Sequence, residues 1–195
     1  RYHYPTCVTL SPVRRKQLAE WATRHNILVI EDDLAGFYQD QGRRLLPLSA
    51  MLPKSNYIYI SAFSKILAPA IRVGYVASDI QLVEQIAQYR TLVDIQGDNV
   101  MEHTLAELIS NGDIKRHLLR ASRTYAERLD YISKQVENLL GDKVRYTKPH
   151  GGLAIWIELP GNQWEKRLAA RHIQAPIFSL PEGREGIRIG FASMQ

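Results

Sequence analysis

The sequence predicts an α/β protein in which a layered α/β unit is followed by a smaller α+β unit. Helical and strand-like patterns alternate over residues 11–77, and a long amphipathic pattern covers 113–140. Short strand-like runs then surround one short helix. The 195 residues are 45% hydrophobic and 23% charged, which is enough for a buried core and typical of globular proteins. We place a boundary in the long helix, giving domains over 1–120 and 121–195.

The first predicted elements are a helix and a strand. The helix is expected over residues 11–25, with Ser11 as its N-cap and Pro12 at its first position. The apolar run Ile27–Ile30 follows and is typical of a strand buried on both faces. The apolar stripe expected along the helix consists of Leu18, Trp21 and Ala22.

The middle of the chain is predicted to hold two strands and three helices. The strands cover 57–61 and 72–77, and Asp79 is a good N-cap for the next helix. Another helix covers 99–109. The apolar side of the long helix over 113–140 consists of Leu118, Leu119, Tyr125, Leu129, Ile132, Val136 and Leu139. Beyond it we expect strands at 144–146, 153–157 and 187–191 and a helix at 164–170.

Composition excludes several classes of protein. The single cysteine, Cys7, rules out an internal disulfide framework and a cysteine-based zinc cluster, and it favours the reducing cytoplasm. No apolar run reaches 18 residues, so no membrane partner is expected. The net charge is +5, and much of the excess lies within 113–148, where acidic residues accompany the basic ones along a helix. We interpret this as a solvated helix face rather than a DNA-binding surface.

Lys65 is the first candidate for chemistry. It lies just after the strand predicted at 57–61, among small and apolar residues, and such sheet edges are where α/β proteins bind ligands. Desolvation and a neighbouring cation lower the pKa of an amine and make it a better nucleophile toward a carbonyl. Arg72, seven residues further on, offers a guanidinium suited to a phosphate. The alternative is an ordinary surface lysine whose stem packs on the protein.

Two other groups of charged residues lie near predicted strands. Glu31, Asp32 and Asp33 follow an apolar run, where carboxylates bind Mg²⁺, hold a pyridinium nitrogen or cap the next element. Arg188 lies inside the last apolar run, where a guanidinium needs a partner. That partner is either the carboxylate of a ligand or a structural carboxylate.

Four segments together resemble fold-type I aminotransferases, which use pyridoxal 5′-phosphate (PLP). They are Val29–Asp33, Phe63–Tyr75, Pro149–Gly152 with Trp156, and Ile187–Ala192. The closest resemblance is to the aminotransferase-like C-terminal domain of MocR-type transcriptional regulators, in the GntR superfamily. Tyr4-Pro5-Thr6 before a Ser-Pro-x-Arg-Arg helix is similar to that branch.

The resemblance implies a role for each matching residue. Lys65 corresponds to the lysine that forms a Schiff base with PLP, and Asp32 to the carboxylate that keeps the pyridine nitrogen protonated. Arg188 corresponds to the residue that binds the carboxylate of an amino acid. The implied cofactor-binding residues are Tyr4, Asp32, Ser64, Lys65 and Arg72.

The sequence also departs from the family pattern. Leu34 and Ala35 stand where a tyrosine is usual, Ala62 replaces a Ser or Thr, and Cys7 replaces a Gly. These changes imply weaker cofactor geometry and turnover rather than loss of Schiff-base formation. The chain begins at Arg1, and residues 1–6 are interpreted as the tail of a strand followed by a turn, so we expect a fragment of a longer protein. In the family a phosphate loop, a stacking aromatic and a winged helix precede this point.

Three functions follow from these observations. The first is a PLP-binding effector domain of a MocR-type regulator, which senses PLP, an amino acid or an amine. The second is an active aminotransferase that moves an amino group between an amino acid and a 2-oxo acid. The third is a degenerate domain kept for dimerisation. The resemblance implies a homodimer, and contact with DNA only through a winged-helix domain outside this sequence.

Overall fold

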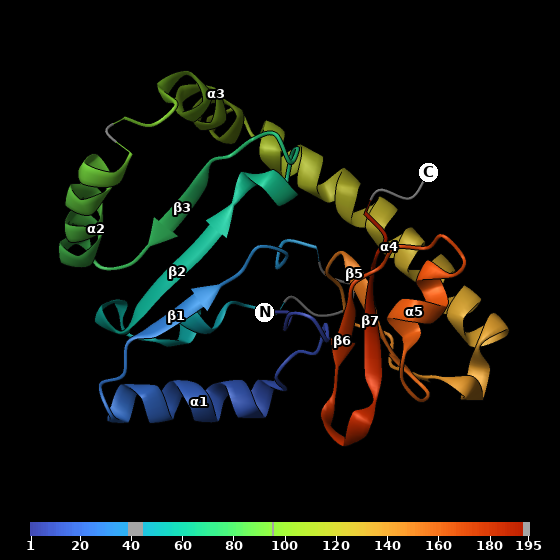
Figure 1. Cartoon of the computed structure of the whole chain (residues 1–195). Coiled ribbons are helices and arrows are strands. Elements are labelled where there is room, and N and C mark those ends of the chain that lie inside the picture. The colour runs from blue at the N-terminus through green and yellow to red at the C-terminus, as the bar shows by residue number, and fades with distance from the viewer. Residues whose placement is uncertain (39–44, 95, 193–195) are drawn as a thin grey trace. The chain divides into compact units, whose positions relative to one another are not determined.

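The computed structural model describes residues 1–38, 45–94 and 96–192 (Figure 1). The described residues form two compact units. The first contains Arg1, Leu10–Phe37 and the described part of Arg44–Ala121, and the second contains Tyr2–Thr9, Tyr38 and the described part of Ser122–Gln195. The division into domains over 1–120 and 121–195 stays a prediction.

A three-stranded sheet organises the first unit. Strands β1 (Val29–Asp32), β2 (Tyr57–Ala62) and β3 (Gly74–Ala77) lie in the order β1-β2-β3. β1 is parallel to β2, with Asp32 opposite Ile60, whereas β3 is antiparallel to β2 (Figure 1). The carboxyl ends of β1 and β2 therefore meet at one edge of the sheet. This arrangement confirms the predicted α/β class.

Helix α1 (Pro12–Arg24) begins as predicted, because the Ser11 hydroxyl accepts a hydrogen bond from the backbone N–H of Arg14. Leu18 and Ala22 of the predicted stripe face the core, but Trp21 is 50% exposed. Buried Ala19 and Ala22 instead make a core with Leu48 and Leu52, from the segment that holds the 3₁₀ helices η1 (Leu48–Met51) and η2 (Lys54–Asn56). Small side chains thus form the contact in place of the tryptophan.

Strand β1 starts two residues later than predicted and is not buried on both faces. Ile27 belongs to the turn after α1, because its N–H binds the carbonyl of Ala22 and its carbonyl accepts from the Asn56 amide. Ile30 is 63% exposed, so the described residues leave its face of the strand uncovered. The prediction was wrong because an apolar run records composition but not whether other elements cover both faces of the strand.

Helices follow the sheet in the first unit. The 3₁₀ helix η3 (Phe63–Lys65) ends β2, and α2 (Ile80–Val93), α3 (Asn99–Ser110) and α4 (Asp113–Leu139) come after β3. As predicted, the Asp79 carboxylate caps α2 by accepting from the N–H of Leu82. None of the residues of α2 is buried. The core on this side of the unit is formed by Phe63, Ile66, Leu105 and Ile114.

The second unit contains an antiparallel sheet in the order β4-β5-β7-β6. Its strands are β4 (Arg145–Tyr146), β5 (Ala154–Leu159), β6 (Ile177–Ser179) and β7 (Glu185–Gly190). Strand β6 is absent from the sequence-based prediction because three residues are too few to show alternation. The remaining elements of this unit are η4 (Gly141–Lys143), α5 (Trp164–Ala169) and η5 (Pro181–Gly183).

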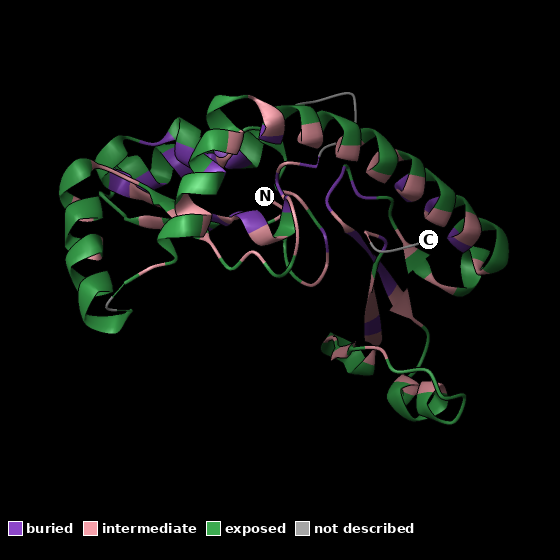
Figure 2. Cartoon of the chain, turned by 90° about the horizontal axis from the view of Figure 1, so that it is seen from above, coloured by how far each residue is buried: buried purple, intermediate pink, exposed green. Residues whose placement is uncertain are grey.

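The core of the second unit lies between α4 and the sheet, and it is formed by Leu129, Val136, Ile155, Ile157 and Phe191. Figure 2 shows buried and half-buried residues along one side of α4 and exposed residues along the other. Leu119 and Leu139 are 59% and 69% exposed, contrary to the predicted apolar side. Each lies ten residues from Leu129, which at 3.6 residues per turn turns it about 80° away. Among the described helices, none is long and apolar enough to cross a membrane.

Candidate functional site

The three consecutive carboxylates at the end of β1 have three different environments. Glu31 is buried, and its two oxygens accept hydrogen bonds of 2.8 Å each from the backbone N–H groups of Leu48 and Ser49. These N–H groups open the 3₁₀ helix η1 and have no partner within it. For Glu31, capping of another element is therefore the correct interpretation.

Asp33 is held in a buried ion pair. Its side chain is 1% exposed, and its Oδ2 accepts from Arg1 Nε at 2.7 Å and from the Tyr59 hydroxyl at 2.8 Å. Burial alone would raise the pKa of the Asp33 carboxyl, but the hydrogen bonds and the charge of Arg1, with the bond from Tyr59, lower it below its ordinary value. Burial and the Asp33 carboxylate raise the pKa of Tyr59. Asp33 is thus committed to a structural pair.

Asp32 is the exposed member of the three. Neighbouring side chains on a strand point to opposite faces, so Asp32 points away from the face that buries Glu31 and Asp33. Its position opposite Ile60 places it at the carboxyl edge of the parallel pair β1–β2. Of these three carboxylates, Asp32 is therefore the exposed one at this edge, and its role as a cofactor contact stays a prediction.

Lys65 lies at the same edge of the sheet, at the end of η3. Its side chain is exposed, whereas Phe63 and Ile66 beside it are buried in the core and fix the turn. The buried Ser61 hydroxyl donates to the carbonyl of Asp33 at 2.9 Å, which ties the ends of β1 and β2 together. The structure therefore brings the segments that carry Asp32 and Lys65 to one sheet edge.

Ser64 and Arg72 lie at the two ends of the turn between β2 and β3. The Ser64 hydroxyl donates to the carbonyl of Ile71, and the N–H of Phe63 binds the carbonyl of Val73 at 3.0 Å, so the turn is closed on itself. Arg72 is exposed. Because the Ser64 proton is already donated to the Ile71 carbonyl, the guanidinium of Arg72 is, of these two side chains, the one that still offers hydrogen-bond donors to an anion. Their roles as phosphate contacts stay predictions.

Arg188 belongs to the second unit, on β7, opposite Trp156 of β5. Its guanidinium carbon lies 5.2 Å from the centre of the Tyr4 ring, in a cation–π contact. Within the described residues no carboxylate forms an ion pair with it. Its role as the residue that binds the carboxylate of an amino acid stays a prediction. Tyr4, predicted as a cofactor contact, is 66% exposed.

Cys7 lies next to this arginine and takes a left-handed backbone conformation, with φ of 59°. A glycine adopts this conformation without strain, which gives a physical reason for the glycine that the resemblance implies at this position. Burial raises the pKa of the Cys7 thiol, and the charge of Arg188 and its hydrogen bond to the thiol offset part of the shift. The thiol therefore stays protonated at neutral pH.

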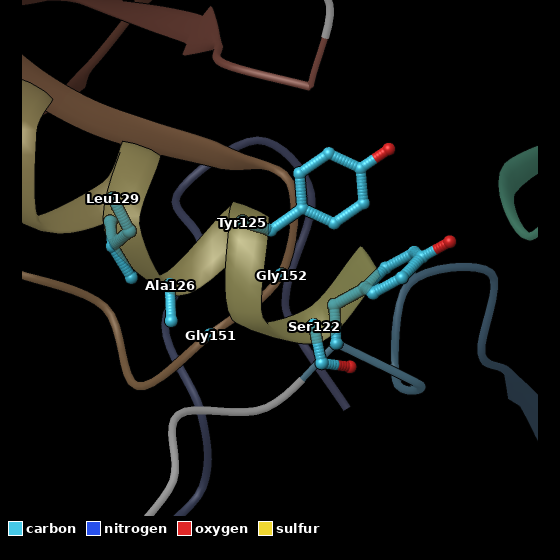
Figure 3. A pocket seen from close by; sticks show the side chains of 7 residues that line it. Ser122, Tyr125, Ala126, Leu129, Gly151 and Gly152 are labelled. Atoms are coloured by element: carbon cyan, nitrogen blue, oxygen red, sulfur yellow. The ribbon is translucent and has the colours of Figure 1, made fainter. Parts of the chain in front are cut away.

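The second unit also contains a small pocket that the sequence did not indicate (Figure 3). Tyr38 and Tyr125 meet edge to face, with ring centres 4.7 Å apart, and the Tyr38 carbonyl accepts from the N–H of Gly152 at 2.7 Å. None of the predicted site residues lines it. The lining residues are Tyr38, Ser122, Tyr125, Ala126, Leu129, Gly151 and Gly152.

Comparison with known proteins gives the same fold. The sequence profile of the family described as aminotransferase class I and II matches residues 2–195. An uncharacterized aminotransferase, SSO0104, of Saccharolobus solfataricus is 29% identical over 96% of this chain and 49% of its own length. The uncharacterized HTH-type transcriptional regulator YisV of Bacillus subtilis is 27% identical over 98% of this chain and 41% of its own length.

Among solved structures, kynurenine aminotransferase of Pyrococcus horikoshii, in complex with PMP, superposes with a TM-score of 0.89 at 24% identity. The superposition includes 100% of this chain and 50% of the kynurenine aminotransferase chain. The chain thus spans about half the length of the relatives it matches, and those relatives include both aminotransferases and transcriptional regulators. The match of residues 2–195, with the α/β architecture of fold type I, shows that the chain belongs to the class I and II aminotransferase family.

Proposed function

We propose that this chain is the PLP-binding, aminotransferase-like effector region of a MocR-type regulator of the GntR superfamily. The observation that carries the proposal is the sheet edge at which Asp32 is the exposed carboxylate and Lys65 follows the adjacent parallel strand. The likeness to regulators, together with Leu34 and Ala35 in place of the usual tyrosine, supports a sensor over a catalyst. DNA binding belongs, in this proposal, to a winged helix outside these residues.

The donor set at this edge fits the cofactor. PLP supplies an aldehyde, a phosphate and a ring nitrogen that is basic enough to take a proton. The Lys65 amine would bind the aldehyde carbon, and the Asp32 carboxylate would hold the proton on the ring nitrogen. The guanidinium of Arg72 would contact the phosphate, and the Ser64 hydroxyl would do so by turning its proton from the Ile71 carbonyl to a phosphate oxygen. Tyr4 is proposed as a further contact of the cofactor.

Arg188 is proposed to bind the carboxylate of an amino acid or related amino compound. A guanidinium binds a carboxylate through two parallel hydrogen bonds, which orients the compound as well as holding it. The cation–π contact holds the guanidinium beside the Tyr4 ring. In the regulatory proposal, such binding changes the balance between two states of a homodimer.

The first experiment is a visible absorption spectrum with added PLP. It is recorded for this chain and for the product of the complete reading frame that encodes it, each beside its Lys65→Ala variant. We expect a visible absorption band from the bound cofactor. This band should be absent in Lys65→Ala, because the Lys65 amine is the group proposed to join the cofactor covalently. A wild-type spectrum identical to that of the variant in both proteins would remove the PLP proposal and favour a domain kept for dimerisation.

The second candidate function is an active aminotransferase, which the likeness to SSO0104 supports. The product of the complete reading frame is mixed with PLP and a panel of amino acids, and formation of 2-oxo acids is measured. Spectral changes without sustained product formation support the sensor. Repeated turnover that disappears in Lys65→Ala supports the enzyme.

A further inference from the structure

Asp32 stands between two buried carboxylates that are both fixed. Glu31 accepts two backbone N–H bonds from η1, and Asp33 accepts side-chain bonds from Arg1 and Tyr59. Both anchors lie on the face of the chain opposite Asp32, because side chains alternate along a strand. The two neighbours therefore fix the backbone at Asp32 and the face of the strand from which its side chain leaves.

The anchor at Asp33 is the more elaborate of the two. Besides the two side-chain donors, the Asp33 N–H binds the carbonyl of Ile60 at 2.9 Å, and the Asp33 carbonyl accepts from Ser61 Oγ at 2.9 Å. Tyr59, Ile60 and Ser61 are consecutive residues of β2. The end of β1 is thus joined through both the backbone and the side chain of Asp33 to the strand that leads to Lys65.

Gly36 leaves the space that the ion pair needs. A Cβ atom at this position would lie 2.1 Å from Arg1 Nε and 2.1 Å from Asp33 Oδ1. Both contacts are far shorter than real atoms allow, so any side chain at position 36 would displace the pair. The pair is consequently a built feature of the turn after β1, not an incidental surface contact.

The pair is also costly for stability. Arg1 and Asp33 side chains are 8% and 1% exposed, and removing two charges from water offsets much of their attraction. Among the described residues, Oδ1 of Asp33 has no hydrogen-bond partner although it is buried. Such an arrangement gives little net stability. It does fix the orientation of the Asp33 carboxylate, because Oδ2 takes three short contacts from the side chains of Arg1 and Tyr59.

We propose that Arg1, Asp33 and Tyr59 are positioning residues that fix the end of β1, so that the Asp32 carboxylate would be held where it can contact the ring nitrogen of PLP. This inference rests on the proposed function, in which Asp32 contacts the cofactor. A charged hydrogen bond acts over about 2.7–2.9 Å, and a displacement of about 1 Å weakens it strongly. Loosening the end of β1 therefore weakens the contact of Asp32 without removing it.

The test compares Tyr59→Phe with Tyr57→Phe in the product of the complete reading frame. Both variants remove one hydroxyl from β2, but only that of Tyr59 donates to Asp33. The dissociation constant for PLP and the pH midpoint of the visible band of the bound cofactor are measured. We expect Tyr59→Phe to weaken PLP binding on the order of tenfold and to shift the midpoint. Tyr57→Phe should change neither by more than about twofold.

Thermal unfolding of the same variants separates positioning from stability alone. A Tyr59→Phe variant that unfolds at a lower temperature, yet keeps the wild-type dissociation constant and pH midpoint, overturns the inference and leaves the PLP proposal intact. A wild-type protein without a Lys65-dependent band overturns the proposed function, and this inference with it. The two failures are therefore distinguishable in one set of spectra.

Discussion

At the scale of single residues, the end of β1 shows how three identical charges acquire separate tasks. The sequence presents Glu31, Asp32 and Asp33 as one acidic run, which left metal binding, cofactor binding and capping open. Because side chains alternate along a strand, the middle carboxylate is predicted to point to the opposite face from the outer two. This alternation does not predict the partners, because Leu48 and Arg1 are separated from these carboxylates by 17 and 32 residues.

Asp33 makes the stability of the protein depend on pH. The folded state lowers its pKa, so the unfolded state takes up the proton first as the pH falls. The stabilisation is complete above the ordinary pKa of aspartate, about 3.9, and is lost as the pH drops through the folded value. Asp33→Asn should cost about 3 kcal/mol at neutral pH, because Arg1 stays buried without a counter-charge.

Denaturant unfolding of the wild type and of Asp33→Asn, at neutral pH and at about pH 4 and below, checks this prediction. The difference in unfolding free energy between the two proteins should shrink as the pH falls. Asp130→Asn is the matched control, since Asp130 pairs with Lys148 on the exposed surface. A constant difference across the pH range would show that the charge of Asp33 is not what stabilises the fold.

At the scale of elements, caps were predicted well and inward faces less well. Ser11 and Asp79 cap α1 and α2 because an N-cap depends on a few neighbouring residues. The inward faces depend on the packing partner, so Trp21 is exposed where Ala19 and Ala22 meet the core. A local signal is visible in a sequence, whereas a long-range contact is not.

The contact between β1 and η1 supplies a prediction at this scale. Glu31→Gln keeps the shape of the side chain but replaces one accepting oxygen by a donor that faces a backbone N–H. We expect a loss of about 1–3 kcal/mol, because a buried N–H is left without an acceptor. Denaturant unfolding measures the change. Glu20→Gln, at an exposed site on α1, should stay within about 0.5 kcal/mol, and equal losses would contradict the capping role.

At the scale of the whole molecule, the predicted site residues are shared between the two units. Asp32, Ser64, Lys65 and Arg72 belong to the first unit, and Tyr4 and Arg188 to the second. The α/β class and the family resemblance were both accessible from the sequence. The pocket beside Tyr38 was not, since it depends on residues from three distant segments.

This sharing predicts that two kinds of binding respond differently to mutation. Arg188→Ala should weaken binding of amino acids by about tenfold or more, because a charged hydrogen-bond partner is lost, and should leave PLP binding nearly unchanged. Titration of the PLP band, with and without amino acids, measures both. Arg145→Ala, an exposed arginine of β4, serves as the control. Equal losses for PLP and amino acids would indicate a structural role for Arg188.

The path of the chain has a further consequence for dissecting this protein. Tyr2–Thr9 belongs to the second unit although Arg1 and Leu10–Phe37 belong to the first, and Tyr38 belongs to the second again. A single protease cut near residue 121 therefore releases neither unit whole: the N-terminal product retains pieces that complete the other half, and the C-terminal product lacks them. Each unit is built from separate stretches of the chain, so producing either one alone requires joining those stretches by a new linker rather than truncating the chain.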